Sequence, residues 1–311
     1  MGYIGKYINN TELKNSLKSS ELQHPYTALV GGVLDYDSQT ISKEDLEQTY
    51  LTVKIMRNGK FGVGGTPVFY YSVNGGVWKE TKANTITISM YNAGDEIRVK
   101  GTEGGNKLFS EETNSFVVYG NSMSLIYGDD FVGKTDLNGK TFTNMFSGST
   151  GLLNAENLIL PATTLSNGCY GGMFRKCTSL TKAPSLPATT LVNNCYEYMF
   201  QDCTSLTTAP TLPATTLSTY CYRLMFRNCT SLTKAPELLA ATLVNNCYYG
   251  MFNGCSKLNY VKCLATDISI SNSTQNWMNG VADIGTFVKD SSVTWRTGSN
   301  GIPTNWTVEE V

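Results

Sequence analysis

A repeat of 26 residues governs the second half of the chain and limits what it can fold into. One column of cysteines keeps this step at Cys169, Cys195, Cys221 and Cys247, and a second column follows at Cys177, Cys203, Cys229 and Cys255. Tyrosine, Met-Phe and leucine positions recur on the same step, which gives the unit C-Y-x-x-M-F-x-x-C-T-S-L-T-x-A-P-x-L-P-A-T-T-L. A fixed period between roughly 20 and 50 residues indicates stacked units that cannot bury their apolar faces alone. The repeat therefore predicts a solenoid.

Within one unit, the spacing of apolar residues predicts a short helix and then a short strand. On a helical period, Cys169, Met173 and Cys177 share one face. Pro184 and Pro187 cannot continue a helix, so the paired strand is expected over 179–183, just before the first proline. This order predicts a coil of leucine-rich-repeat type. The positions that vary between coils should face solvent, namely 171–172, 175–176, 181–182, 185, 192–194 and their equivalents.

The front of the chain follows a period of two instead. Five runs alternate apolar and polar residues, and the turn-forming pairs and triplets at 58–59, 74–76 and 93–95 separate them. The runs cover 51–55, 68–73, 85–90, 96–100 and 115–119. Short strands joined by hairpin turns predict a small β-sandwich of immunoglobulin-like type. With the repeats, the expected fold class is α+β.

These patterns divide the chain into four predicted parts. Residues 1–48 form a polar attachment arm with a short helix around 10–22, and residues 49–120 form the sandwich. Residues 121–265 form the solenoid, with a degenerate cap over 121–168 and full units from about 169. Residues 266–311 form the C-terminal capping segment.

The cysteine grid admits three interpretations. On a helical rise, Cys169 and Cys177 would have Cα atoms about 12 Å apart, whereas a disulfide needs less than about 7 Å. Cysteines one coil apart would point in parallel into the core, and the total of nine is odd. Free cysteine is often a small buried apolar residue. A packing ladder is therefore the leading interpretation, with disulfides and a metal site as alternatives.

Charge and histidine content exclude several classes of function. The 24 basic and 25 acidic residues give a net charge of −1, so neither nucleic acid nor an anionic membrane is an expected partner. No apolar run approaches the ~20 residues of a membrane span. The N-terminus lacks the basic segment followed by an apolar one that is typical of a secretion signal, so we expect none. His24 is the only histidine, which excludes most histidine-based hydrolases and zinc sites.

Two further patterns resemble enzyme sites. The segment Gly128-Asp-Asp-Phe-Val-Gly-Lys-Thr135 fits the phosphate-binding pattern G-x-x-x-x-G-K-T, but its two aspartates and the glycine turn after it favour an ordinary turn. Between 151 and 265 the acids are only Glu156, Glu197, Asp202 and Glu237, and none recurs as an aligned pair for glycosidase chemistry. Eight bases in the same span give it a charge of +4. We predict no catalytic, cofactor or metal site.

The exposed strand positions are the candidate ligand-binding residues. Stacking would align them into a strip of hydroxyl and lysine groups on a concave face, the surface that solenoids use for binding. The strip comprises Thr181, Lys182, Thr207, Thr208, Thr233, Lys234, Asn259 and Tyr260. Ordinary solvated positions are the alternative reading of the same residues.

The units Cys-Tyr-x-x-Met-Phe-x-x-Cys-Thr-Ser-Leu-Thr and Leu-Pro-Ala-Thr-Thr-Leu resemble the BspA-like (Treponema-type) leucine-rich repeats of Bacteroidales and their phages. The tail, with Cys263-Leu-Ala-Thr-Asp, Gly285-Thr-Phe and Gly301-Ile-Pro-Thr-Asn-Trp-Thr-Val, resembles the closing segment of such proteins. The resemblance covers about residues 121–311 and implies adhesion or recognition without catalysis.

From the resemblance and the lack of a leader we expect a non-catalytic structural or recognition protein of a phage particle, of tail or fibre type. Its N-terminal region would contact other virion proteins, and its solenoid would bind a host surface glycan or protein. It would be made in the host cytoplasm and reside in the virion, with a homo-oligomer left open. The alternative is a bacterial cell-surface adhesin, and a weaker one is a carbohydrate-active enzyme.

Overall fold

The computed structural model describes residues 29–30, 33–34, 41–111, 114–270 and 272–311. These residues form mainly strands with few helices, which confirms the expected mixture in a strongly β-rich form. The helix predicted around 10–22 lies outside the described residues. Of the predicted arm, β1 (Leu29–Val30) pairs antiparallel with β2 (Val33–Leu34), and α2 (Lys43–Glu47) begins where the Ser42 side chain accepts a hydrogen bond from the Asp45 amide.

Residues 51–121 form two sheets, and all five predicted runs contain strands. One sheet has the order β6-β5-β8-β3-β10, and the second has the order β7-β4-β9. The strands of the first are β3 (Leu51–Ile55), β5 (Tyr70–Val73), β6 (Lys79–Glu80), β8 (Glu96–Lys100) and β10 (Phe116–Asn121). Those of the second are β4 (Gly59–Gly65), β7 (Thr85–Tyr91) and β9 (Phe109–Glu111). The sequence did not predict β4, β6 or β9.

The two sheets pack through a shared aromatic core. Phe61 of β4 contacts Phe116 of β10 edge to face, with ring centroids 5.0 Å apart. Behind this contact, α3 (Ser124–Tyr127) and the 3-10 turn η2 (Gly128–Asp130) close one end of the first sheet. The Ser124 hydroxyl accepts from the Leu51 amide and donates to the Val99 carbonyl, so α3 is fixed to both β3 and β8. We refer to residues 51–130 as the sheet unit.

Strand β10 joins the sheet unit to the repeats. It pairs antiparallel with β3 on one side, and on the other it pairs parallel with β11 (Leu152–Asn154) and β12 (Leu158–Ile159). The ring of Phe109 stacks on Phe146 of the first, incomplete repeat, with centroids 5.6 Å apart. The interior of the sheet unit therefore continues directly into that of the repeats.

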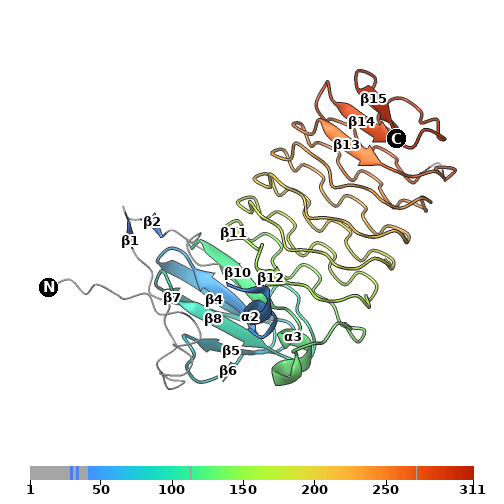
Figure 1. The fold of residues 1–311 in the computed structure, drawn as a ribbon. Helices are drawn as coiled ribbons and strands as arrows, with labels where there is room; N and C mark the ends of the chain where they lie inside the picture. Colours follow the sequence, from blue (N-terminus) through green and yellow to red (C-terminus); the bar gives the residue numbers. More distant parts are fainter. Residues whose placement is uncertain (1–28, 31–32, 35–40, 112–113, 271) are drawn as a thin grey trace.

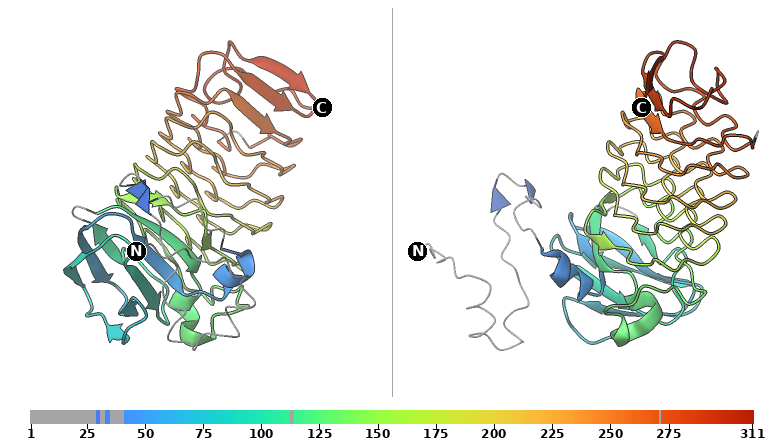
Figure 2. Two further views of the ribbon diagram at one scale, coloured as in Figure 1. Left: turned by 60° about the vertical axis from the view of Figure 1, so that its left-hand side comes forward. Right: turned by 45° about the vertical axis from the view of Figure 1, so that its right-hand side comes forward.

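Figures 1 and 2 show the repeats as coils piled one on another from the sheet unit to the C-terminus. Two columns of rings run through the pile, with neighbouring centroids 5.4–6.1 Å apart. One column is Phe109, Phe146, Phe174, Phe200, Phe226 and Phe252, and the other is Phe142, Tyr170, Tyr196, Tyr222, Tyr248 and Trp277. We refer to residues 135–311 as the repeat stack.

The predicted short helices are absent, because between 131 and 311 the described residues form turns and strands only. Every fourth residue of the segment after each first-column cysteine has a positive φ, as at Gly172 (60°) and Lys176 (62°). Amides alternate between a carbonyl three residues back and one on the next coil. Thus Met173 donates to Tyr170 at 3.2 Å and Phe174 donates to Met199 at 2.9 Å. A left-handed residue at each fourth position interrupts right-handed helix propagation, so the segment is a ribbon of successive turns.

The strand predicted over 179–183 is also shorter than expected. The described coils pair there through single residues, as Lys182 does with Thr208 and Lys234 with Tyr260, because the prolines that follow remove backbone donors. Continuous pairing returns only at the far end. There β13 (Tyr260–Cys263), β14 (Thr286–Lys289) and β15 (Thr307–Glu310) form a parallel sheet beside the capping ring of Trp277.

Candidate functional site

The predicted strip is assembled along one edge of the repeat stack. Its residues occupy the single-residue bridges and their neighbours, and all are exposed except the half-buried Tyr260. The Lys234 ammonium lies 4.8 Å from the centre of the Tyr260 ring, and the Lys182 ammonium lies 2.9 Å from a Glu156 oxygen. The structure thus brings the predicted residues together in coil order, and their ligand remains a prediction.

The cysteine grid packs inside the stack. All nine cysteines are buried and free, and the second-column thiols donate to backbone carbonyl oxygens of the preceding coil at 2.9–3.1 Å. Burial raises the pKa of Cys169, Cys247 and Cys255 to about 12, whereas reactive or metal-binding cysteines need a lowered pKa. These thiols therefore serve as core residues and inter-coil donors.

The four carboxylates between residues 151 and 265 link neighbouring coils. Each contacts a cationic or amide group about one repeat away. The pairs are Glu156 with Lys182 at 2.9 Å, Glu197 with Arg223 at 2.6 Å, Asp202 with Asn228 at 2.7 Å, and Glu237 with Lys262 at 3.3 Å. Because each carboxylate faces a nitrogen partner on the adjacent coil, this arrangement lacks the facing pair of carboxyl groups that glycoside hydrolysis uses.

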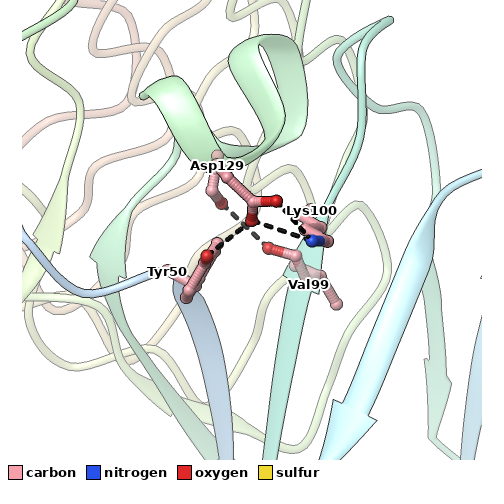
Figure 3. A network of polar contacts seen from close by, with 5 residues as sticks. Tyr50, Val99, Lys100 and Asp129 are labelled. Carbon is pink, nitrogen blue, oxygen red and sulfur yellow. Dashed lines mark hydrogen bonds and ion pairs between the residues drawn. The ribbon is translucent and has the colours of Figure 1, made fainter. Parts of the chain in front are cut away.

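The segment that resembles a phosphate-binding loop is a structural turn. Gly128–Asp130 forms η2, and no helix follows it among the described residues. Asp129 accepts a hydrogen bond from the Tyr50 hydroxyl at 2.6 Å and pairs with the Lys100 ammonium at 2.8 Å, as Figure 3 shows. The Lys134 ammonium lies over the Tyr127 ring at 5.3 Å. The lysine and aspartate of the pattern are thus engaged within the protein, which agrees with the turn interpretation.

The sequence did not predict a groove that lies along the turn ribbons of the stack. It has a volume of about 530 Å³ and crosses successive coils. Two positions predicted to face solvent, Gln201 and Leu224, are instead buried in its lining. The polar and aromatic residues that line it include Arg175, Tyr198, Gln201, Arg223, Arg227 and Tyr249.

Stacked guanidinium and tyrosine groups define one wall of this arginine groove. Arg223 lies over the rings of Tyr198, Tyr220 and Tyr249, at 5.3–5.4 Å from their centres. Arg175, from the coil before Tyr198, lies 5.6 Å from the same Tyr198 ring. The Arg223 guanidinium also pairs with Glu197 at 2.6 Å. These contacts hold the arginine side chains in fixed orientations.

Two buried polar atoms of the groove have no hydrogen-bond partner among the described residues. They are Nε of Arg175, a donor, and Oε1 of Gln201, an acceptor. Gln201 is only 5% exposed. Buried polar atoms normally find a partner, so an unpaired donor and acceptor in one groove point to a bound polar molecule.

A sequence signal for the groove was present. Two variable columns, 171-197-223-249 and 175-201-227-253, stand four residues apart and contain Arg175, Arg223 and Arg227. If the segment is taken as a helix, these arginines form no recognisable cluster. The turn ribbon returns to the same side every four residues, which places both columns beside one another.

Comparisons with protein-family models, with curated proteins and with solved structures find no match for this chain. Over the described ranges, no three His, Cys, Asp or Glu residues are grouped so that they could hold a metal ion. None of the helices in that part of the chain has the length and apolarity that a bilayer crossing requires.

Proposed function

We propose that the protein is a non-catalytic recognition protein whose repeat stack is a solenoid of leucine-rich-repeat type, related to the BspA-like repeats that its units resemble. One observation carries this proposal: the Cys, Tyr, Met and Phe residues repeated from coil to coil are buried, whereas the edges and the groove present repeated threonines and most of the variable residues. A scaffold with a constant interior and a variable exterior suits binding along an extended surface.

The sheet unit supports an immunoglobulin-like sandwich as the attachment module. Its β4–β7 and β5–β8 pairs are antiparallel and lie in separate sheets, as the inner strand pairs of such sandwiches do. It differs in one respect, because β3 lies between β8 and β10 and separates the last strand from β8. The proposal is therefore a related sandwich with an inserted first strand.

The biological setting that we propose is a phage particle. The sheet unit and the arm before it would attach to other virion proteins, and the repeat stack would extend toward the host surface. The stack projects from the sheet unit at one end only, with the C-terminal strands farthest away, which suits this division (Figure 1). The alternative, a bacterial cell-surface adhesin, would use the same scaffold with another anchor.

Localisation in purified particles tests the setting. We expect antibody against the full chain to label virions and to find the protein in particles banded on a density gradient. Recovery only with bacterial envelope fractions would overturn the phage assignment and favour the adhesin.

Binding of labelled full chain to host cells tests recognition by the strip. The variant Thr207→Glu/Thr208→Glu/Lys234→Glu places three acids on the strip, and Thr189→Glu/Thr215→Glu/Lys257→Glu makes the same charge change at exposed positions elsewhere. We expect the strip variant to lose at least tenfold in cell binding and the control to lose less than twofold. Equal losses in both would remove the strip from the proposal, and no binding by the parent chain would contradict recognition of the host.

A further inference from the structure

We propose that the arginine groove binds an acidic saccharide, a sugar chain that carries carboxylate groups beside its hydroxyls. The inference rests on the proposed recognition function but concerns a different surface from the strip. It follows from the charge of the groove, the fixing of its side chains and the unpaired atoms within it.

The charge of the groove favours an anion. Three arginines line it, and Glu197 neutralises only Arg223. Arg175 and Arg227 have no carboxylate partner among the described residues. The four acids between residues 151 and 265 pair instead with Lys182, Arg223, Asn228 and Lys262. A guanidinium presents a planar fork of donors that matches a carboxylate, so two such groups remain free to bind one.

The groove is also ordered before a ligand arrives. Arg175 and Arg223 approach Tyr198 from the coils before and after it, and Arg223 is held further by Glu197. Arginine side chains lose considerable rotamer entropy when they bind, and side chains that are already stacked lose less. A groove built in this way gains affinity without new contacts.

The unpaired atoms and the covered Tyr198 ring together favour a saccharide over a nucleic acid. Nε of Arg175 needs an acceptor, and Oε1 of Gln201 needs a donor. A sugar supplies both, because its hydroxyls donate as well as accept. Single-stranded nucleic acid would instead need open aromatic faces for its bases, and both neighbouring guanidinium groups already cover the Tyr198 ring.

The spacing suits several linked sugar units. The rings of Phe174, Phe200 and Phe226 step by 5.4 and 5.6 Å from coil to coil, so Arg175 and Arg227, two coils apart, have backbones about 11 Å from each other. The volume of about 530 Å³ falls in the range of sites that enclose drug-sized ligands. The groove therefore fits a short stretch of chain with acidic groups on separate units.

The test measures binding of polygalacturonate to the full chain by calorimetry at physiological salt, with neutral dextran and an oligothymidylate as comparison ligands. We expect saturable binding of polygalacturonate only. Arg175→Gln/Arg227→Gln should weaken it at least tenfold. The control Lys82→Gln/Lys257→Gln removes the same charge at exposed positions outside the groove and the strip and should weaken it less than twofold.

Two further variants distinguish a specific loss of binding from misfolding and from a general effect of charge. Arg227 is exposed, so Arg227→Gln alone should keep the parent melting temperature and still weaken binding severalfold. Gln201→Leu changes no charge and should weaken binding because it removes the buried acceptor. No saturable binding of polygalacturonate, equal losses in groove and control variants, or tighter binding of oligothymidylate would each overturn the inference. Host-cell binding by the strip is measured separately and would stand in all three cases.

Discussion

The sheet unit and the repeat stack bury their interiors in different ways. In the sheet unit each core contact is unique and joins residues far apart in the chain, as Phe61 does with Phe116. In the stack one set of contacts recurs at every coil, as in the Phe174, Phe200 and Phe226 column. A repeated interior leaves variation only at edges and grooves, so the comparison shows where a chain of this kind has room to acquire binding chemistry.

The two regions also differ in the chemistry of their cores. All nine cysteines lie in the stack, and none occurs before Cys169. Thiols in the stack donate hydrogen bonds to carbonyl oxygens of the preceding coil, and the sheet unit has no cysteine that could do so. The regions nevertheless share β10, so they are coupled at one strand while remaining distinct in composition.

Alkaline pH should separate the regions most strongly. Burial raises the pKa of eight of the stack thiols, to about 12 at Cys169 and Cys263, above the unfolded value of about 8.5. The unfolded chain therefore releases these protons first. Stability is fully present below about pH 8.5 and falls as pH rises toward 12, by about 1.4 kcal/mol per thiol for each pH unit.

Hydrogen exchange with mass spectrometry at stepped pH measures this loss by region, after correction for the intrinsic pH dependence of exchange. We expect the coils to lose protection before strands β3 and β8 do. Thiolate absorbance of the native chain should stay low until the coils open. Titration of the native thiols near pH 8.5 would contradict their burial.

The alternation of the front strands and the period of the coils could be predicted from residues alone, but the local structure of each coil could not. Cys169, Met173 and Cys177 are spaced by four, which fits a helical face and a four-residue turn ribbon equally well. The distinguishing signal was the frequent Gly, Asn or Asp at the left-handed positions, such as Asn194, Asp202 and Gly254, since these residues tolerate positive φ.

Strand β4, the longest of the three missed strands, and the missed groove have different physical causes. Strand β4 contains four glycines in seven residues, which hides the alternation of Phe61 and Val63. The groove depends on side chains from several coils, including the burial of Gln201 and the stacking of Arg223. Such contacts follow from how coils are offset, which no single unit of sequence specifies. The strip could be predicted because the alignment of its residues depends only on the 26-residue repeat.

Truncating one ring in each region should lower the free energy of unfolding by similar amounts. The two variants should differ in how far from the substitution hydrogen exchange increases. Phe61 and Phe200 are both fully buried, so Phe61→Ala and Phe200→Ala should each cost about 3–5 kcal/mol in chemical denaturation. Since coils contact only their neighbours, Phe200→Ala should raise hydrogen exchange in adjacent coils and leave β8 protected. Phe61→Ala should raise exchange across both sheets. Uniform changes in both variants would show that the chain unfolds as one unit.

A smaller effect tests the turn ribbon. Lys176 is exposed with a φ of 62°, a conformation that costs a non-glycine residue about 1–2 kcal/mol, whereas glycine adopts it freely at an entropic cost of about 0.5–1 kcal/mol. Lys176→Gly should therefore raise the free energy of unfolding by up to about 1 kcal/mol. Lys257→Gly, at an exposed position outside the left-handed region, should lower it. Destabilisation by both substitutions would mean that a helix, not the ribbon, forms there.

The smallest effect concerns a contact at one end of the first sheet, where Asp129 of η2 joins Tyr50 and Lys100 (Figure 3). Hydrogen bonds from Lys100 and Tyr50 lower the pKa of the Asp129 carboxyl, so its contribution is present above the unfolded value of about 3.9 and is lost as pH falls. Its side chain is 64% exposed, and water screens the pair. Asp129→Asn should cost about 0.5 kcal/mol at neutral pH in thermal unfolding and less at pH 3, whereas Asp130→Asn should cost nothing at either pH. A loss above about 2 kcal/mol for Asp129→Asn would mean that this exposed contact, and not the buried Ser124 hydrogen bonds, fixes α3 and η2 to the sheet.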